Sequence, residues 1–115
     1  MRENIIVKES KQFAIRTIRL YQHLCGNRHE FVLSKQLLRA GTSIGANVRE
    51  AIQAQSRNDF ISKMQIALKE ACETEYWLEL LHETDYLSDK EFESIAADCT
   101  KVNKILISIV KSTRT

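Results

Sequence analysis

Residues 88–110, SDKEFESIAADCTKVNKILISIV, decide the fold class of this chain. They open with the S-x-x-E capping box of Ser88 and Glu91, whose side chains satisfy the first free N–H groups of a helix. Apolar residues then recur every three or four positions, the spacing of one helix face. They are Phe92, Ile95, Cys99, Val102, Leu106 and Ile109. We therefore predict an amphipathic helix over residues 89–112.

Two stretches before this helix show the same period. The first spans residues 4–25, and we expect Gly26 to end it in the left-handed conformation that favours glycine. The second spans residues 34–55, with Ser34 as a candidate N-cap. Its apolar face is lined by small residues, including Gly41 and Gly45, which allow another helix to approach closely.

A fourth periodic stretch covers residues 57–83. Ser56 and Asp59 before it form an acidic variant of the capping box. Four amphipathic helices joined by short connections predict an all-α fold, an antiparallel up-down-up-down four-helix bundle that occupies residues 1–115 as one domain.

The composition agrees with this prediction and excludes other classes. The chain has 115 residues, 43% apolar and 28% charged, with a net charge of +2, which is typical of a globular protein and not of a disordered one. It has no Pro and only three Gly, too few turn formers for a β-sandwich or barrel. We see no export signal and no membrane span, so we expect a cytoplasmic protein. Cys25, Cys72 and Cys99 show no CxxC spacing, and we interpret them as reduced core residues.

Charge is distributed unevenly along the sequence. Residues 1–57 hold ten Lys or Arg and four Asp or Glu, a net +6, whereas residues 58–115 hold seven and eleven, a net −4. The basic half predicts a surface that attracts nucleic-acid phosphates without reading sequence. The candidate contacts are Lys8, Lys11, Arg16, Arg19, Lys35, Arg39 and Arg49. The alternatives are an ordinary solvated face, an acidic neighbouring subunit, or a protein partner that makes the chain an adaptor or scaffold.

The helix over 57–83 carries a second apolar stripe, rotated from the first. The stripe consists of Ile66, Trp77, Leu80 and Leu81. A single bundle core does not need this much apolar surface, and a patch that contains Trp is typical of a protein interface. We therefore predict a homo-oligomer that uses this stripe; the alternative is that neighbouring helices wrap further around it.

Polar residues also fall near the expected core. Glu75 lies in the main apolar stripe of its helix, where a carboxylate needs a partner or a proton. Its candidate partners are His82, Arg16, Tyr21 and Asn47, and we interpret Glu75 and Asn47 as a buried polar network. The paired Glu-x-x-His motifs of metal-binding bundles are missing, so we predict no metal and no cofactor.

Catalytic motifs are also missing. His29 and Glu30 begin like H-E-x-x-H, but Leu33 stands where the second His would be. There is no nucleophile elbow, phosphate-binding loop or dinucleotide fingerprint. We predict that the chain is not an enzyme, unless several chains build a site around a ring axis.

Residues 33–81 resemble the family of small four-helix-bundle proteins encoded within intervening sequences of bacterial 23S rRNA genes. The most specific pieces are QLLRA (36–40), Ser43 and Ile44 with Asn47 and Glu50, ALKE (67–70) and ETEYWL (73–78). This family looks related to the accessory proteins of diversity-generating retroelements. The resemblance implies an up-down bundle, a pentameric ring and, for the retroelement relatives, a basic surface that engages RNA or DNA and a reverse transcriptase.

Overall fold

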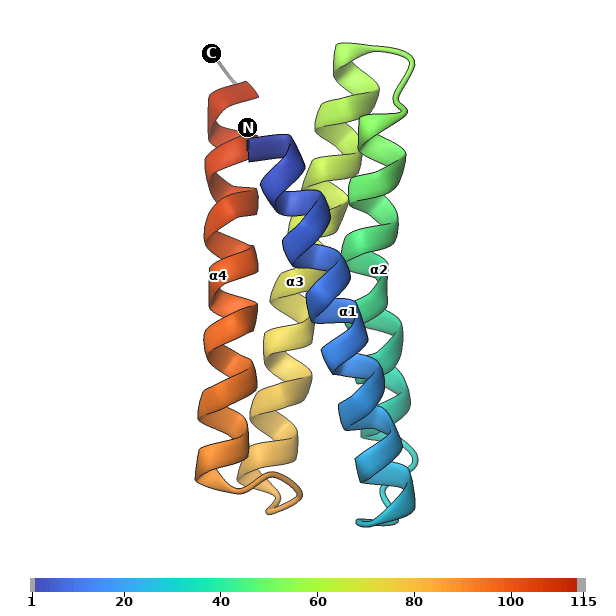
Figure 1. Ribbon diagram of the computed structural model, residues 1–115, viewed down its shortest axis with the longest axis vertical. Helices are drawn as coiled ribbons and strands as arrows, with labels where there is room; N and C mark the ends of the chain where they lie inside the picture. Colours follow the sequence, from blue (N-terminus) through green and yellow to red (C-terminus); the bar gives the residue numbers. More distant parts are fainter. Residues whose placement is uncertain (1, 114–115) are drawn as a thin grey trace.

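A computed structural model describes residues 2–113 as four long helices joined by short connections (Figure 1). The helices are α1 (Arg2–Gly26), α2 (Leu33–Ile52), α3 (Arg57–Glu83) and α4 (Asp89–Thr113). The expected ranges are confirmed to within one or two residues, except that α2 ends three residues before 55. Residues 53–55 form the connection to Ser56, which is extended and caps α3.

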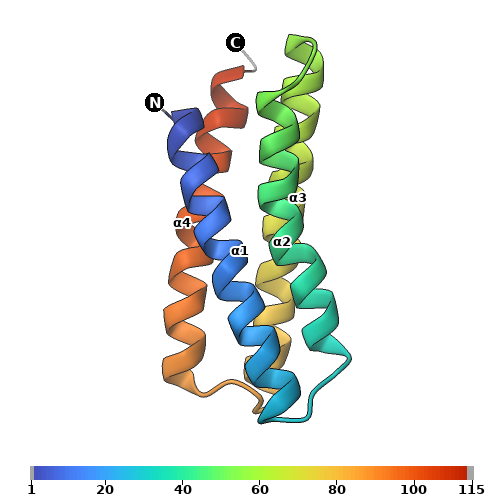
Figure 2. The same cartoon turned by 45° about the vertical axis from the view of Figure 1, so that its right-hand side comes forward.

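The four helices form an antiparallel bundle that is 44 Å long and about 20 Å wide. Each helix runs opposite to the one before it, as Figures 1 and 2 show from two directions. α1 packs against α2 and α4, and α3 packs against the same two helices, so α1 and α3 lie diagonally across the core. This arrangement confirms the predicted up-down-up-down bundle.

The core is built from the predicted stripes. Fully buried side chains come from all four helices, among them Ile6, Leu37, Met64 and Leu106. Burying each such side chain contributes about 1.5–3 kcal/mol to folding. The helix stripes therefore fix both the fold and the direction in which each outer face points.

Glycines bring α1 and α2 unusually close. A Cβ atom placed on Gly41 would lie 2.6 Å from Thr17 Cγ2, and one on Gly45 would lie 3.4 Å from the backbone oxygen of Ser10. Thr17 and Ser10 are both buried in this seam. The close approach predicted from the glycine spacing is thus present, and its partner is α1.

Two helix starts follow the predicted capping chemistry. Ser56 Oγ accepts a hydrogen bond from the backbone N–H of Asp59 at 3.1 Å. Ser88 Oγ accepts one from the N–H of Glu91, and Glu91 Oε1 accepts one from the N–H of Ser88 at 2.8 Å. The second pair is a complete capping box.

The start of α2 differs from the prediction. Ser34 already lies inside the helix, and the buried carboxylate of Glu30 performs the capping: it accepts hydrogen bonds from the N–H groups of Val32, Leu33 and Ser34. Gly26 is not left-handed; the positive φ of this connection falls on His29, at 55°. The residue after this turn is Glu30, whose carboxylate reaches the first turn of α2.

Candidate nucleic-acid interface

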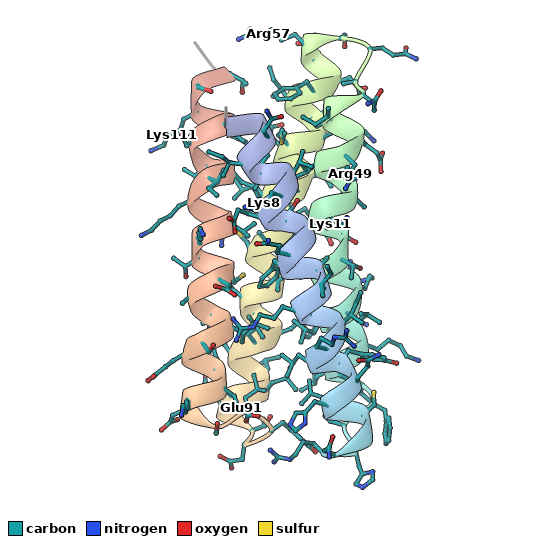
Figure 3. All side chains as sticks on the ribbon, viewed as in Figure 1. Lys8, Lys11, Arg49, Arg57, Glu91 and Lys111 are labelled. Carbon is teal, nitrogen blue, oxygen red and sulfur yellow. The ribbon has the colours of Figure 1, made fainter. Side chains whose placement is uncertain are left out.

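The helix directions separate charge along the bundle axis. One half contains the start of α1, the end of α2, the start of α3 and the end of α4, and we call it the basic half. Figure 3 shows Lys8, Lys11, Arg49, Arg57 and Lys111 in this half and Glu91 in the other. In the sequence, positive and negative charge separate between the first and second halves of the chain. In the folded bundle, they separate between its two ends.

The basic half combines cations from all four helices. They are Lys8, Lys11, Arg49, Arg57, Lys63, Lys101, Lys104 and Lys111, against the acids Glu9, Glu50 and Asp59 among residues 4–113. Glu9 pairs with Lys101 at 3.3 Å and Glu50 with Lys63 at 3.0 Å. Two of the few acids are therefore neutralised locally, which leaves a net positive surface.

Three of the predicted contacts lie together in this half. Lys8 and Lys11 on α1 and Arg49 on α2 are exposed, and within the described part of the chain none of them forms an ion pair. Lys11 and Arg49 flank a shallow groove of about 180 Å³ between the two helices. Its floor is made of small residues, including Ser10 and Gly45. Cations beside such a floor allow a phosphate backbone to approach closely.

Arg16 and Arg39 are engaged inside the molecule. Arg16 Nη1 contacts Asp98 Oδ2 at 2.5 Å, and the same guanidinium donates to Ser94. Arg39 pairs with Glu73 and, at 3.1 Å, with Glu70, whose side chain is buried. These two guanidinium groups hold neighbouring helices together, so they would have to share or leave these ion pairs to contact a phosphate, and their assignment as phosphate contacts stays a prediction.

Arg19 and Lys35 are exposed but lie outside the basic half. Arg19 is on the second half of α1, and Lys35 is in the first turn of α2. Acids dominate at this end of the bundle. They include Glu79, Glu83, Asp85, Asp89, Glu91 and Glu93. The seven predicted cations thus do not form one continuous surface.

Sequence reasoning missed two lysines of the same surface. Lys104 and Lys111 project from the last half of α4, exposed and without an ion pair in the described residues. They belong to the acidic half of the sequence, so a count along the chain hid them. The predicted antiparallel topology could have identified them, because it places the end of α4 beside the start of α1.

The predicted interface residues of α3 divide between surface and core. Ile66 is 38% exposed and Leu80 is partly exposed. Trp77 is half-buried against the core, and its Nε1 donates to Glu73 at 3.2 Å. Leu81 is fully buried and contacts the chain's own core, so it is wrong as a contact with a second chain. Neighbouring helices therefore cover Leu81, whereas Ile66 and Leu80 reach the surface and stay predicted contacts.

The buried network predicted at Glu75 and Asn47 is different from what we expected. Glu75 is half-buried and accepts a hydrogen bond from Asn103 of α4, which was not among its candidate partners. Burial raises the pKa of the Glu75 carboxyl, and the nearby Glu79 raises it further. Asn47 is half-buried and donates to Ser43 of its own helix at 2.9 Å. The two residues lie on separate helices and serve separate contacts.

The cysteines occupy three environments. Cys99 is buried, and burial raises the pKa of its thiol to about 12. Cys25 is half-buried, but Cys72 is exposed on α3 and is not the core residue that we expected. Among residues 2–113 no three His, Cys, Asp or Glu side chains meet in an arrangement that holds a metal ion. None of the described helices has the length and continuous apolar character needed to cross a membrane.

Comparisons with known proteins place this fold in a family. The sequence model described as "23S rRNA-intervening sequence protein" matches residues 2–108. A crystal structure of a protein of unknown function from the S23 ribosomal protein family of Bacteroides thetaiotaomicron VPI-5482 is 58% identical, with a TM-score of 0.95. The match covers 96% of this chain and 99% of that one. The curated proteins gave no match. Neither description names an enzymatic activity.

Proposed function

The chain belongs to the 23S rRNA-intervening sequence protein family, and from its charge distribution we propose that it is a non-enzymatic protein that binds nucleic acid through the basic half. One observation carries the proposal: Lys11 and Arg49, exposed and unpaired among the described residues, flank a groove floored by small residues, and the exposed Lys8 lies one helical turn before Lys11. We place this activity in the cytoplasm.

Binding of this kind is electrostatic. Lysine and arginine side chains displace counterions from the phosphate backbone, so affinity falls steeply as salt rises. Among the described residues that line the groove between α1 and α2 none is aromatic, so they offer no ring on which a base could stack. The expected ligand is therefore a phosphate backbone, in RNA or in DNA, bound with little base readout.

Self-association is the second part of the proposal. The part of the α3 stripe that reaches the surface, Ile66 and Leu80 with an edge of Trp77, supports contact with a second copy. The family resemblance adds the expectation of a pentamer and, from the retroelement relatives, of a reverse transcriptase as partner.

An adaptor that binds only proteins is the competing function, and one observation favours it. Phe31 and Val32, in the connection before α2, are 55% and 73% exposed. The connection that carries them is held firmly by the hydrogen bonds to Glu30. Apolar area held at the surface in a fixed position is suited to contact with an apolar pocket of a partner protein.

The test compares two double variants with equal change in charge. Lys8→Gln with Lys11→Gln neutralises the basic half, and Lys35→Gln with Lys90→Gln neutralises two exposed lysines at the opposite end. Fluorescence anisotropy with labelled duplex RNA and DNA is measured at several salt concentrations. We expect the first variant to weaken binding about tenfold or more at low salt and the second to weaken it much less.

Three results would contradict the proposal. If wild-type affinity were unchanged when the salt concentration is doubled, the electrostatic mechanism would be wrong. Equal losses in both variants would show that net charge, and not this surface, governs binding. If neither nucleic acid bound at low salt, the adaptor function would be favoured.

A further inference from the structure

The outer face of α1 carries apolar side chains that the bundle does not use. Ile15 and Ile18 are 48% and 39% exposed, although Phe13 and Thr17 of the same helix are buried. The two isoleucines are three residues apart and therefore lie side by side on the surface of the helix. Arg19 lies next to them, exposed and without an ion pair in the described residues. The second half of α1 thus presents an apolar pair with a positive charge beside it to solvent.

The outer face of α3 offers a complementary surface. Tyr76 is 54% exposed, and Leu80, one turn later, is partly exposed. The exposed carboxylates of Glu79 and Glu83 lie beside them. Tyr76, Leu80 and Glu83 are spaced by four and three residues, so they form one stripe along the helix. This stripe combines apolar contact area with negative charge.

The two faces cannot meet within one molecule. α1 and α3 lie diagonally across the bundle, and their outer faces point in different directions (Figures 1 and 2). They are matched in kind, however, because each has two neighbouring apolar side chains and the charges beside them have opposite sign. A second copy of this chain supplies the missing partner for each face.

We propose that Ile15, Ile18 and Arg19 of one chain dock on Tyr76, Leu80 and Glu83 of a second copy. The contact is heterologous, since the two surfaces in it are different, and each chain has one of each. Such a contact continues from chain to chain and closes into a ring or extends into a filament. The proposal rests on the self-association proposed above, and it leaves Lys8, Lys11 and Arg49 free for nucleic acid.

Two double variants and their mixture test the contact by size-exclusion chromatography with light scattering. Ile15→Ser with Ile18→Ser removes the α1 face, and Tyr76→Ser with Leu80→Ser removes the α3 face. We expect each variant alone to lose the wild-type assembly and run as a monomer. An equimolar mixture should form a one-to-one dimer, because each variant still carries the surface that the other needs.

The matched control changes two isoleucines elsewhere. Ile52 and Ile107 are 41% and 40% exposed, on α2 and α4, so Ile52→Ser with Ile107→Ser removes similar apolar area. This control should keep the wild-type assembly. Far-UV circular dichroism and thermal unfolding establish that each variant is folded; if the α3 variant is not, Glu79→Lys with Glu83→Lys replaces it, with the same expected dimer in the mixture.

The outcomes separate this inference from the proposed function. A monomeric wild type would overturn self-association and this contact together, without touching nucleic-acid binding. A wild-type assembly that survives in both variants would overturn this contact alone. Variants that dissociate singly but form no dimer when mixed would show that α1 and α3 do not contact each other.

Discussion

At the scale of single residues, Glu30 has the clearest structural role. Burial alone would raise the pKa of its carboxyl, but hydrogen bonds from the N–H groups of Leu33, Ser34 and Val32 outweigh burial and lower the pKa below the ordinary value of 4.5. Both carboxylate oxygens are used, and the Ser34 hydroxyl also donates to the Glu30 backbone oxygen. One side chain thus caps α2 and fixes the connection from α1.

Glu30→Gln should destabilise the fold in a pH-dependent way. The amide places a donor where the carboxylate accepts an N–H group, and losing a hydrogen bond to a charged group costs about 1.5–3 kcal/mol. Because the folded-state pKa is lowered, this stabilisation is present above the ordinary pKa and is lost as the pH falls through the folded value. Urea unfolding at pH 7 and pH 3 should show a difference from wild type that shrinks at pH 3.

Glu93→Gln is the control for this prediction, since Glu93 is exposed on α4 and has no ion pair among the described residues. It should change stability by less than about 0.5 kcal/mol at either pH. A Glu30→Gln protein as stable as wild type at pH 7 would mean that the cap contributes nothing.

At the scale of helices, the seam between α1 and α2 depends on one glycine more than on the other. Gly41→Ala drives a methyl group into Thr17, a buried, β-branched side chain whose hydroxyl donates to Phe13, so it cannot move aside freely. We expect a loss of about 1–3 kcal/mol in chemical unfolding. Gly45→Ala meets its nearest atom at 3.4 Å and gains helix propensity, so it should be neutral or stabilise by up to about 1 kcal/mol.

A second substitution separates this clash from a general intolerance of alanine in α2. Thr17→Ala removes the two atoms nearest to the new methyl group. Combined with Gly41→Ala, it should recover part of the lost stability, so that the two changes are not additive. Additive losses would show that the clash with Thr17 is not the cause.

Local chemistry explains which parts of the molecule were predictable. Ser56 and Ser88 cap helices through residues three positions away, so sequence spacing was sufficient. Contacts between helices depend on register, which no spacing within one helix supplies. For this reason the hydrogen bond of Asn103 to Glu75 was not predicted, nor were the ion pairs of Arg39 with Glu70 and Glu73 of α3.

The same limit applies to the surfaces. Periodicity identified the second apolar stripe of α3 but did not show that the neighbouring helices cover Leu81 completely. The prediction of a basic face likewise considered each helix alone and did not include the partners that neighbouring helices supply. The assignment of Lys8, Lys11 and Arg49 stays a prediction, while Arg16 found a partner on α4.

At the scale of the whole molecule, the antiparallel topology determines which charges act together. Chain order places Lys104 and Lys111 in the half of the sequence that carries net negative charge, but the fold returns them to the end of the bundle that holds Lys8 and Lys11. If nucleic acid follows this end of the bundle, α4 should contribute to binding although it is distant in sequence from α1.

Lys104→Gln with Lys111→Gln tests this consequence of the topology. If both lysines contact phosphates, the slope of log affinity against log salt for duplex DNA should become less steep by up to about two. The variant with Gln at positions 35 and 90 has the same net charge and should keep nearly the wild-type slope. A slope unchanged in the α4 variant would confine the interface to α1 and α2, where the groove between Lys11 and Arg49 would bind the backbone alone.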